Sequence, residues 1–206
     1  MPWTITGGAV LRDGALTDAP LALDGALVTE APVPGARRFD AGGLLVLPGL
    51  VDIHGDAHER QLQPRPGVDI PAPLALRDTA AQLIACGITT AYLGVTLSWE
   101  PGLRSLPAWR ALKAALPAAR AQAATDIRVH LRFEADNFGA LDDALEGIAD
   151  GSIHLLGFND HTPAIVKKLH DPVQAAKYAA RAGMEAAAFR ALAVAVAARR
   201  DQIPAA

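Results

Sequence analysis

The residues best suited to chemistry lie in three short segments, of which the first and third come directly after an apolar run. The first segment, residues 52–56, reads Asp-Ile-His-Gly-Asp. Side chains two positions apart share one face of a strand, so we expect Asp52, His54 and Asp56 to point together. Ile53 is then expected to pack on the other face. An imidazole with carboxylates suits Zn, Mn or Fe, and a polar loop with an incidental histidine is the alternative.

The second segment alternates strictly between polar and apolar side chains. His130, Arg132 and Glu134 are predicted to share one face, and Leu131 and Phe133 the other. A base, a guanidinium and a carboxylate are costly to bury in a packed core, so this face is expected to line a wet cavity. An edge strand whose polar face meets solvent is the alternative, and Arg132 could then simply neutralise Glu134.

The third segment is Asn159-Asp160-His161-Thr162-Pro163, after the apolar residues 153–158. Three predicted strands thus end in a histidine or a carboxylate. A parallel barrel collects its catalytic groups at that end of its strands, which favours one shared site.

Two arginines are candidate anion binders. Arg65 lies in the rigid turn Pro64-Arg65-Pro66-Gly67, and Arg132 lies in the second polar segment. A guanidinium can clamp a phosphate with two parallel hydrogen bonds, so both could bind a phosphorylated substrate. A purely structural role in the turn is the alternative for Arg65.

The elements that must position these residues belong to two segments with different sequence patterns. Residues 1–49 are dense in Gly, Pro and Asp, and Asp13-Gly14 and Asp24-Gly25 between apolar runs predict hairpins in a small β segment. In residues 50–206, strand-like runs alternate with long helical stretches. The predicted strands are 50–54, 89–96, 127–134 and 153–159, and the predicted helices are 73–86, 106–124, 141–150, 172–182 and 184–200.

This alternation predicts an α/β fold with parallel strands covered by helices. A complete (β/α)8 TIM-type barrel takes about 250 residues, so residues 50–206 have room for only about the first four βα units. We therefore predict a partial barrel at 50–206, preceded by a β segment at 1–49. An open parallel sheet is the alternative, although no glycine-rich phosphate fingerprint follows the first strand.

Composition narrows the possible partners. The 206 residues carry a net charge of −3, and this lack of basic excess argues against nucleic-acid or anionic-membrane binding. The single cysteine, Cys86, cannot form an intrachain disulfide and is expected to be a buried small hydrophobe. The start of the chain lacks the pattern of a signal peptide, and the apolar run 191–198 is shorter than the roughly 20 residues of a membrane span. We expect a cytoplasmic protein.

Residues 47–54 resemble the start of the barrel in the amidohydrolase superfamily. Further ordered motifs resemble one branch of it, the α-D-ribose 1-methylphosphonate 5-triphosphate diphosphatases of the carbon–phosphorus lyase pathway. These motifs are His54-Gly55-Asp56 and the segments 64–69, 87–90, 130–134 and 160–163. The resemblance implies a metal-dependent hydrolase of phosphonate catabolism that releases diphosphate, with a barrel joined to a small β-sandwich built from both chain ends.

The resemblance also implies roles for individual residues. His54 and Asp56 would be metal ligands from the first strand, and Glu134 a further ligand or bridging carboxylate. His161 with Asp160 would be a ligand or a catalytic pair. Arg65 and Arg132 would hold the polyphosphate of a small phosphorylated sugar. The cofactor would be a divalent metal ion, of which Zn, Mn and Fe are candidates.

The sequence also departs from that family. The family's later motifs, a Ser-His-Asp-Asp segment, a glycine-rich Ser-His segment and a final-strand aspartate, do not occur here, and Ala164 stands where the family usually has glycine. We therefore expect an N-terminal portion that forms a homo-oligomer or needs a missing C-terminal half. Two alternatives remain: an amidohydrolase acting on a cyclic amide or N-acyl bond, although such enzymes generally carry His-x-His at the first strand, and a non-catalytic half-barrel that dimerises or docks on a partner.

Overall fold

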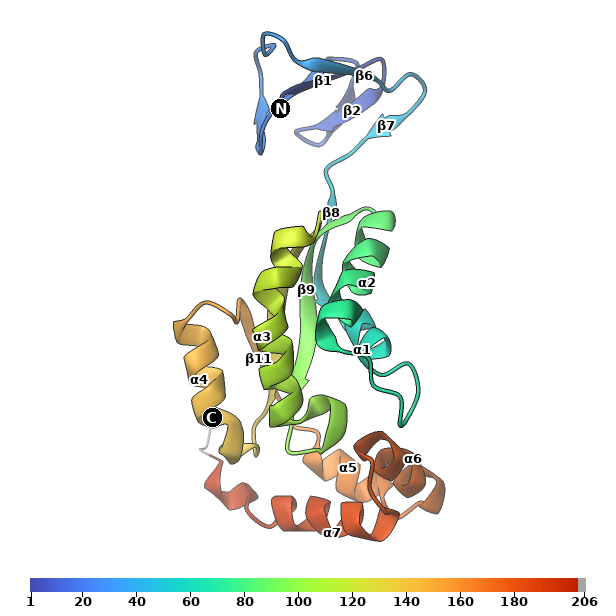
Figure 1. Cartoon of the computed structure of the whole chain (residues 1–206), viewed down its shortest axis with the longest axis vertical. Helices are drawn as coiled ribbons and strands as arrows, with labels where there is room; N and C mark the ends of the chain where they lie inside the picture. The colour runs from blue at the N-terminus through green and yellow to red at the C-terminus, as the bar shows by residue number, and fades with distance from the viewer. Residues whose placement is uncertain (204–206) are drawn as a thin grey trace. The chain divides into compact units, whose positions relative to one another are not determined.

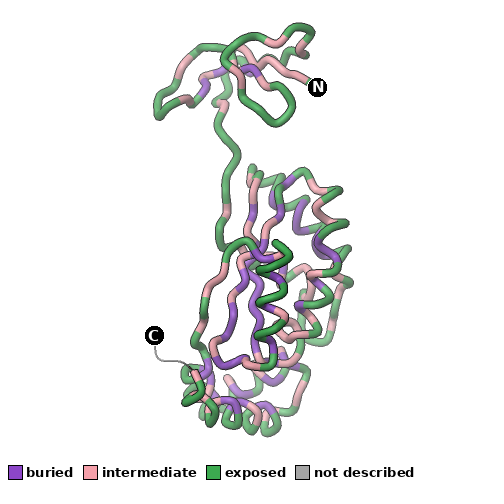
Figure 2. The backbone as a smooth tube through the Cα atoms, turned by 90° about the vertical axis from the view of Figure 1, so that its left-hand side faces the viewer, coloured by how far each residue is buried: buried purple, intermediate pink, exposed green. Residues whose placement is uncertain are grey.

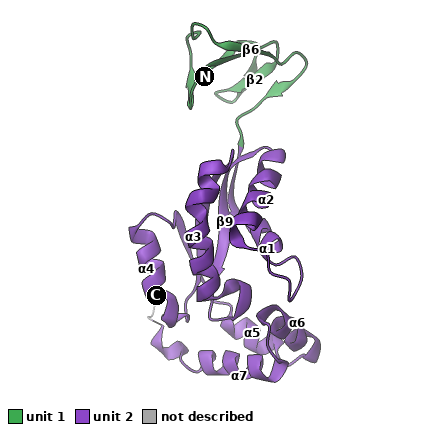
Figure 3. Ribbon diagram, viewed as in Figure 1, with its two compact units in different colours: residues 1–49 green, residues 50–206 purple. Residues whose placement is uncertain are grey.

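The computed structural model describes residues 1–203 and divides into two compact units, residues 1–49 and the chain from Leu50 onward (Figure 3). The first unit holds two small sheets, with strand orders β5-β4-β1-β6 and β3-β2-β7. Their packing as a sandwich stays a prediction. The strands are β1 (Trp3–Thr6), β2 (Ala9–Arg12), β3 (Ala15–Thr17), β4 (Leu21–Asp24), β5 (Leu27–Thr29), β6 (Arg37–Asp40) and β7 (Leu45–Val46).

Both predicted hairpins of the first unit are confirmed. Strands β2 and β3 pair antiparallel and are connected by the turn Asp13-Gly14. Strands β4 and β5 pair antiparallel, and the turn between them begins at Asp24-Gly25. Asp13 and Gly14 have φ values of 49° and 79°. Two successive left-handed residues make the tight turn whose twist matches that of paired strands, and aspartate and glycine tolerate this conformation best.

The second unit alternates strands and helices. All four predicted strands and all five predicted helices are present, with small shifts at their ends. The short helices α1 and α5 were not predicted, because six or seven residues are too few to show a helical period. The elements are β8 (Leu50–Gly55), α1 (Ala57–Leu62), α2 (Ala72–Ala85), β9 (Ile88–Leu97), η1 (Gly102–Arg104), α3 (Leu106–Gln122), β10 (Asp126–Glu134), η2 (Phe138–Ala140), α4 (Leu141–Ala149), β11 (Leu155–Asn159), α5 (Thr162–Lys168), α6 (Pro172–Ala182), α7 (Ala186–Ala197) and η3 (Arg200–Gln202).

The four strands of this unit form one parallel sheet with the order β11-β10-β9-β8 (Figure 1). Each strand lies beside the strand that precedes it in the chain, and the order never reverses. A doubly wound sheet reverses its order at a switch point, whereas a (β/α) barrel adds its strands one after another. The unit is therefore a mixed α/β structure with the parallel sheet of a half-barrel.

The two faces of this sheet differ in chemistry. On the apolar face, alternate residues of β9 and β10 pack with helices α2 and α3 into one core that includes the buried Leu131 and Trp109. In Figure 1, α3 crosses in front of the sheet, and in Figure 2 the buried residues follow the strands and neighbouring helices. The other face, here called the polar face, is formed by Tyr92, Gly94, Thr96, Arg128, His130, Arg132, Glu134, Gly157 and Asn159.

Two sequence predictions about local structure are wrong. Strand β8 does not alternate as expected, since its pairing with β9 shifts register between Asp52 and Gly55. The Asp52 carboxylate accepts a hydrogen bond from the His54 backbone N–H at 3.0 Å, and Ile53 is 62% exposed instead of packed. Cys86 is exposed because it caps the C-terminus of α2 instead of lying on its buried side.

Helices α5, α6 and α7 enclose a second apolar core, in which the Tyr178 ring stacks on the buried Phe189 at 5.9 Å between centroids. The Trp99 indole, just after β9, donates a hydrogen bond of 2.8 Å to the Thr162 hydroxyl of α5. This contact ties the helical layer to the end of the sheet. No helix within residues 1–203 is long and apolar enough to cross a membrane.

Candidate functional site

The polar face gives the long side chains of β10 room, because both neighbouring strands carry glycine beside them. His130 lies opposite Gly94 of β9, and Arg132 lies opposite Gly157 of β11. A Cβ atom at Gly157 would lie only 2.9 Å from His130 Nε2, and one at Gly94 would lie 3.5 Å from Arg132 Cδ. The imidazole and guanidinium thus occupy space that side chains on the flanking strands would otherwise fill.

Two imidazoles meet on this face. The Nδ1 atoms of His54 and His130 are 3.2 Å apart, although strand β9 separates the two strands that carry them. The ring centroids are 4.9 Å apart, and the rings meet edge to face at 67°. His130 Nδ1 also lies 3.2 Å from the carbonyl oxygen of Ile53. The register shift in β8 therefore turns His54 toward β10.

A carboxylate and an imidazole meet where β10 and β11 end. Glu134 is only 3% exposed, and its Oε1 atom lies 2.5 Å from His161 Nδ1. Its Oε2 atom accepts a hydrogen bond of 3.1 Å from the His161 backbone N–H. These donors satisfy the buried carboxylate, which burial alone would destabilise. The His161 side chain remains 48% exposed and so faces solvent beyond this contact.

Arg132 lies between these two pairs along β10. Its Nη1 atom is 3.4 Å from the Thr96 hydroxyl, and no ion pair with Glu134 forms within residues 1–203. His130 and Glu134 are four residues apart on the same strand, which corresponds to about 13 Å. The arginine side chain is therefore available to a ligand that reaches both pairs.

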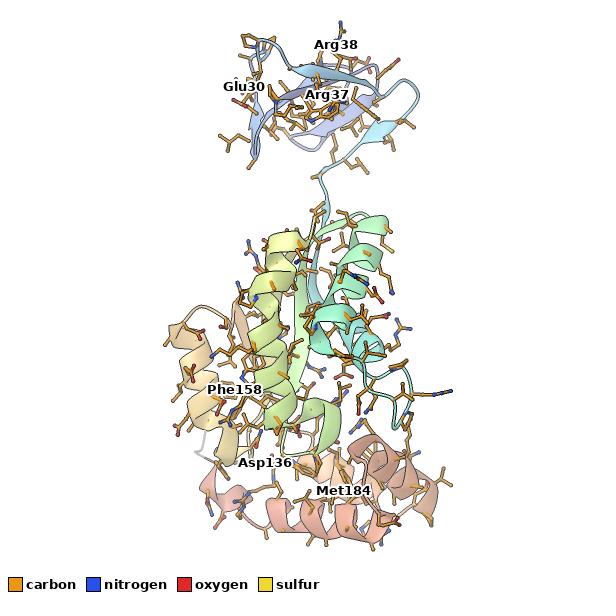
Figure 4. The ribbon with its side chains drawn as sticks, viewed as in Figure 1. Glu30, Arg37, Arg38, Asp136, Phe158 and Met184 are labelled. Carbon is orange, nitrogen blue, oxygen red and sulfur yellow. The ribbon has the colours of Figure 1, made fainter. Side chains whose placement is uncertain are left out.

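Asp160 is engaged elsewhere. Its two carboxylate oxygens accept hydrogen bonds of 2.6 and 2.7 Å from Arg200 of η3, which also contacts Asp136 at 3.0 Å. The hydrogen bond to Asp160 raises the pKa of Arg200. Asp136 is 1% exposed and lies at the end of the sheet nearest α5–α7 (Figure 4). The sequence pattern did not single out Arg200 or Asp136, although Asp136 follows Glu134 by two positions and so continues the alternation of β10.

Asp56 and Arg65 lie apart from these contacts. Asp56 is exposed at the start of α1, where its charge acts on His58 and Arg104. Arg65 is exposed in its turn, where its carbonyl accepts a 3.1 Å hydrogen bond from the Val68 N–H. The predicted turn is present, and in the described part of the chain its guanidinium makes no hydrogen bond or ion pair.

The predicted metal centre can be tested against this geometry. Within residues 1–203, no three His, Cys, Asp or Glu side chains lie close enough together to hold a metal ion. The predicted ligands His54, Asp56, Glu134 and His161 are therefore not gathered at one point. The structure places His54 beside His130 and Glu134 beside His161, while Asp56 precedes α1, and the four-ligand centre stays a prediction.

A cavity of about 700 Å³ lies among α1, the following loop, the start of α3 and the end of α6, and Thr96 of the polar face is one of its lining residues. Its walls are mostly apolar and include the buried His58, whose pKa is lowered chiefly by burial. Beside it, Arg104 binds the Glu59 carboxylate with hydrogen bonds of 3.0 and 2.9 Å. None of the predicted site residues lines this cavity.

Comparisons with known proteins give partial similarities. No protein-family model matches the chain. It is 39% identical over 62 residues to the alpha-D-ribose 1-methylphosphonate 5-triphosphate diphosphatase of Escherichia coli (strain K12), which covers 30% of this chain and 16% of that protein.

Among solved structures, a D-hydantoinase from Bacillus sp. AR9 is 22% identical, with a TM-score of 0.48, over 75% of this chain and 32% of that one. A dihydropyrimidinase from Brevibacillus agri NCHU1002 is 18% identical, with a TM-score of 0.47, over 98% of this chain and 50% of that one. At TM-scores below 0.5 these similarities define neither fold nor activity. The chain spans half or less of the length of these three proteins.

Proposed function

We propose that the polar face carries part of a metal-dependent hydrolase site that releases diphosphate from α-D-ribose 1-methylphosphonate 5-triphosphate. The observation that carries this proposal is the position of Arg132 between a two-imidazole pair and a carboxylate–imidazole pair on one strand face. The partial identity with the Escherichia coli diphosphatase supports the choice of substrate.

Arg132 is proposed to bind the polyphosphate. One of its nitrogens contacts Thr96, so its other N–H groups can donate to phosphate oxygens. Phosphoryl transfer depends mostly on positioning and on stabilisation of the charge that spreads over those oxygens. Arg65, on its exposed turn, is the proposed second anion contact.

His161 is proposed to accept a proton during the reaction. In the contact with Glu134, Nδ1 is the donor, so Nε2 of a neutral ring would carry the lone pair that accepts the proton. Asp160 was predicted as its catalytic partner, but its carboxylate is bound to Arg200. The proton-accepting role therefore falls to His161.

A divalent ion, when bound, would supply Lewis-acid polarisation of a phosphoryl oxygen. His54 was predicted from the sequence to be a metal ligand, and it is the residue of the polar face that we propose in that role. Glu134 already holds two hydrogen bonds from His161, so its contribution is the orientation of that imidazole.

The test is diphosphate release from α-D-ribose 1-methylphosphonate 5-triphosphate, with Zn²⁺ or Mn²⁺ added. We expect His161→Asn to lower the rate by about 100-fold or more, since proton transfer by a positioned side chain contributes that much. His170→Asn is the matched control, because His170 is exposed and outside the polar face. The absence of release by the full chain, or equal rates for both variants, would contradict the proposal.

Hydrolysis of a cyclic amide or N-acyl bond is the second candidate. Its support is the meeting of His54 and His130, which places two imidazoles together without the His-x-His spacing expected of such enzymes. Ring opening of dihydrouracil, measured beside diphosphate release, separates the two candidates. Turnover of the cyclic amide alone would replace the phosphate assignment.

Association of two copies is a third candidate, either alone or together with catalysis. Both edge strands of the parallel sheet expose large apolar side chains, with Val51 62% exposed on β8 and Phe158 72% exposed on β11. Unpaired edges and exposed apolar side chains favour association. We expect a dimer or larger assembly by light scattering, and a monodisperse monomer would exclude this candidate.

A further inference from the structure

The cavity beside α1 has the size of a small-molecule site. Its volume of about 700 Å³ lies within the roughly 300–1,000 Å³ that is typical of ligand pockets. Helix α1, the loop after it, the start of α3 and the end of α6 line the cavity, and in Figure 1 the loop after α1 reaches toward α6. The cavity is therefore formed by the packing of segments distant in sequence and not by a single loop.

The charged side chains of the cavity wall are held by partners or lie in solvent. Glu59 accepts two hydrogen bonds from Arg104, and Arg181 forms an ion pair with the buried Glu100. The remaining carboxylate of the wall, Asp69, is exposed. Within residues 1–203 the wall thus offers no free cation to an anionic ligand, and burying an unpaired anion is costly. The cavity therefore favours a neutral ligand.

One buried polar group of the wall has no partner. His58 is 2% exposed, and its Nδ1 atom makes no hydrogen bond within residues 1–203. A buried polar atom without a partner destabilises the fold, and a ligand that supplies the missing hydrogen bond removes this penalty. Burial lowers the pKa of His58, so the ring is neutral and Nδ1 is a donor or an acceptor according to the tautomer. A hydroxyl group can pair with either tautomer.

The rest of the wall is mostly apolar. Leu62, Ile70 and Leu103 contribute aliphatic side chains, and Trp109 contributes an indole ring. A flat aromatic ring buries a large apolar area and packs favourably against another ring, either offset or edge to face. An aromatic ring that carries one hydroxyl group therefore suits both the apolar wall and His58.

We infer that this cavity binds a neutral phenol, with the aromatic ring against the apolar wall and the hydroxyl group hydrogen-bonded to His58 Nδ1. The inference goes beyond the proposed hydrolysis and gives a role to a histidine that the proposed reaction does not use. Neither a metal ion nor a phosphate takes part in this binding, so it can be tested without any hydrolysis.

The test is equilibrium dialysis of the full chain, near neutral pH, with three probes that share one ring system. These are naphthalene, naphthol and naphthoate, the last two substituted at the same position. We expect saturable binding of naphthol, about 10-fold tighter than that of naphthalene, because its hydroxyl group satisfies a buried polar atom. Naphthoate should bind at least about 10-fold more weakly than naphthol, since its charge would be buried without a cation.

Two pairs of variants locate the site. In His58→Leu the preference for naphthol over naphthalene should fall to less than about 2-fold, because the hydrogen-bonding atom is gone. His170→Leu, at an exposed position, should keep the preference. Ala108→Leu fills part of the cavity and should weaken naphthol binding by about 10-fold. Ala114→Leu lies on the same helix but outside the cavity, and should bind naphthol as the unmodified chain does.

The inference is overturned if the unmodified chain does not bind naphthol, or if His58→Leu keeps the full preference for naphthol over naphthalene. Tighter binding of naphthoate than of naphthol would contradict the assignment of a neutral ligand. If His58→Leu fails to fold by circular dichroism, the comparison of Ala108→Leu with Ala114→Leu decides, and equal affinities for these two contradict the inference. Diphosphate release enters none of these outcomes, so the inference and the proposed function can fail separately.

Discussion

The two faces of the parallel sheet differ in role: residues of the apolar face stabilise the fold, whereas the alternating residues of the polar face carry the groups that could do chemistry. On β10, Val129 and Leu131 are fully buried against the helices, whereas the intervening His130 and Arg132 are half-buried on the polar face. The first pair contributes apolar burial, and the second pair offers groups that a ligand can use. Substitutions at adjacent positions of one strand should therefore differ greatly in how much they lower the free energy of unfolding.

The largest effect is expected from Leu131→Ala. This side chain is 0% exposed within the main core, so its loss should lower the free energy of unfolding by about 2–5 kcal/mol. Arg132→Ala, one residue further on, should change it by less than about 1 kcal/mol, because the one side-chain hydrogen bond that Arg132 donates within residues 1–203 is long, at 3.4 Å. Urea denaturation with an unchanged m value is the measurement.

The comparison fails if both variants lose the same stability. A large loss in Arg132→Ala would mean that the polar face is part of the packed core and not a ligand surface. Arg132→Met is the control for that outcome, because it keeps most of the aliphatic stem without the charge.

A smaller effect on the free energy of unfolding is expected at Asp136, where a charged side chain is buried instead of lying on the polar face. Asp136 is a buried carboxylate at the end of β10, and Arg200 supplies its ion pair. Arg200→Ala should lower the free energy of unfolding by about 1–3 kcal/mol, because it leaves that carboxylate without its cation. In Arg200→Ala/Asp136→Asn the second change should recover part of the loss, as measured by urea denaturation. A double variant less stable than Arg200→Ala would show that Asp136 is stabilised by other groups.

The sequence predicted the sheet and its helices because apolar periodicity is a local signal. The runs at 89–96 and 127–134 alternate cleanly, so strands β9 and β10 lie close to their predicted bounds. Strand β8 does not follow this alternation. The Asp52 carboxylate accepts a hydrogen bond from the backbone N–H of His54, and the register of pairing with β9 shifts at this point. Such competition between side chain and ladder is a physical detail that alternation alone does not contain.

The candidate site was less predictable because its contacts join distant segments. The shared face of His130, Arg132 and Glu134 follows from alternation, and the structure has it. The meeting of His54 with His130 depends on glycine in the strand between them and on the irregular β8, and neither feature pointed to this pair in advance. Arg200 donates hydrogen bonds to Asp160, which lies 40 positions earlier in the sequence, and no local pattern predicts this contact.

The smallest of these effects concerns His58, the buried imidazole of α1. It is 2% exposed, and its pKa is lowered from 6.5, chiefly by burial, against the opposing charges of Glu59 and Asp56 and with help from Arg104. Because the folded pKa lies below the unfolded one, the unfolded chain takes up this proton first as the pH falls. The contribution of a neutral His58 is therefore complete above about pH 6.5 and declines as the pH falls through the folded pKa.

The measurement is the free energy of unfolding by urea from about pH 7.5 down to about pH 5, where one buried neutral histidine should give a visible slope. His58→Leu should flatten that slope, since it removes the titrating group along with a buried Nδ1 atom that has no partner within residues 1–203. His170→Leu, at an exposed position, should leave the slope as it was. An equal slope in all three proteins would mean that His58 titrates alike in the folded and unfolded chains, and that α1 does not shield it from water.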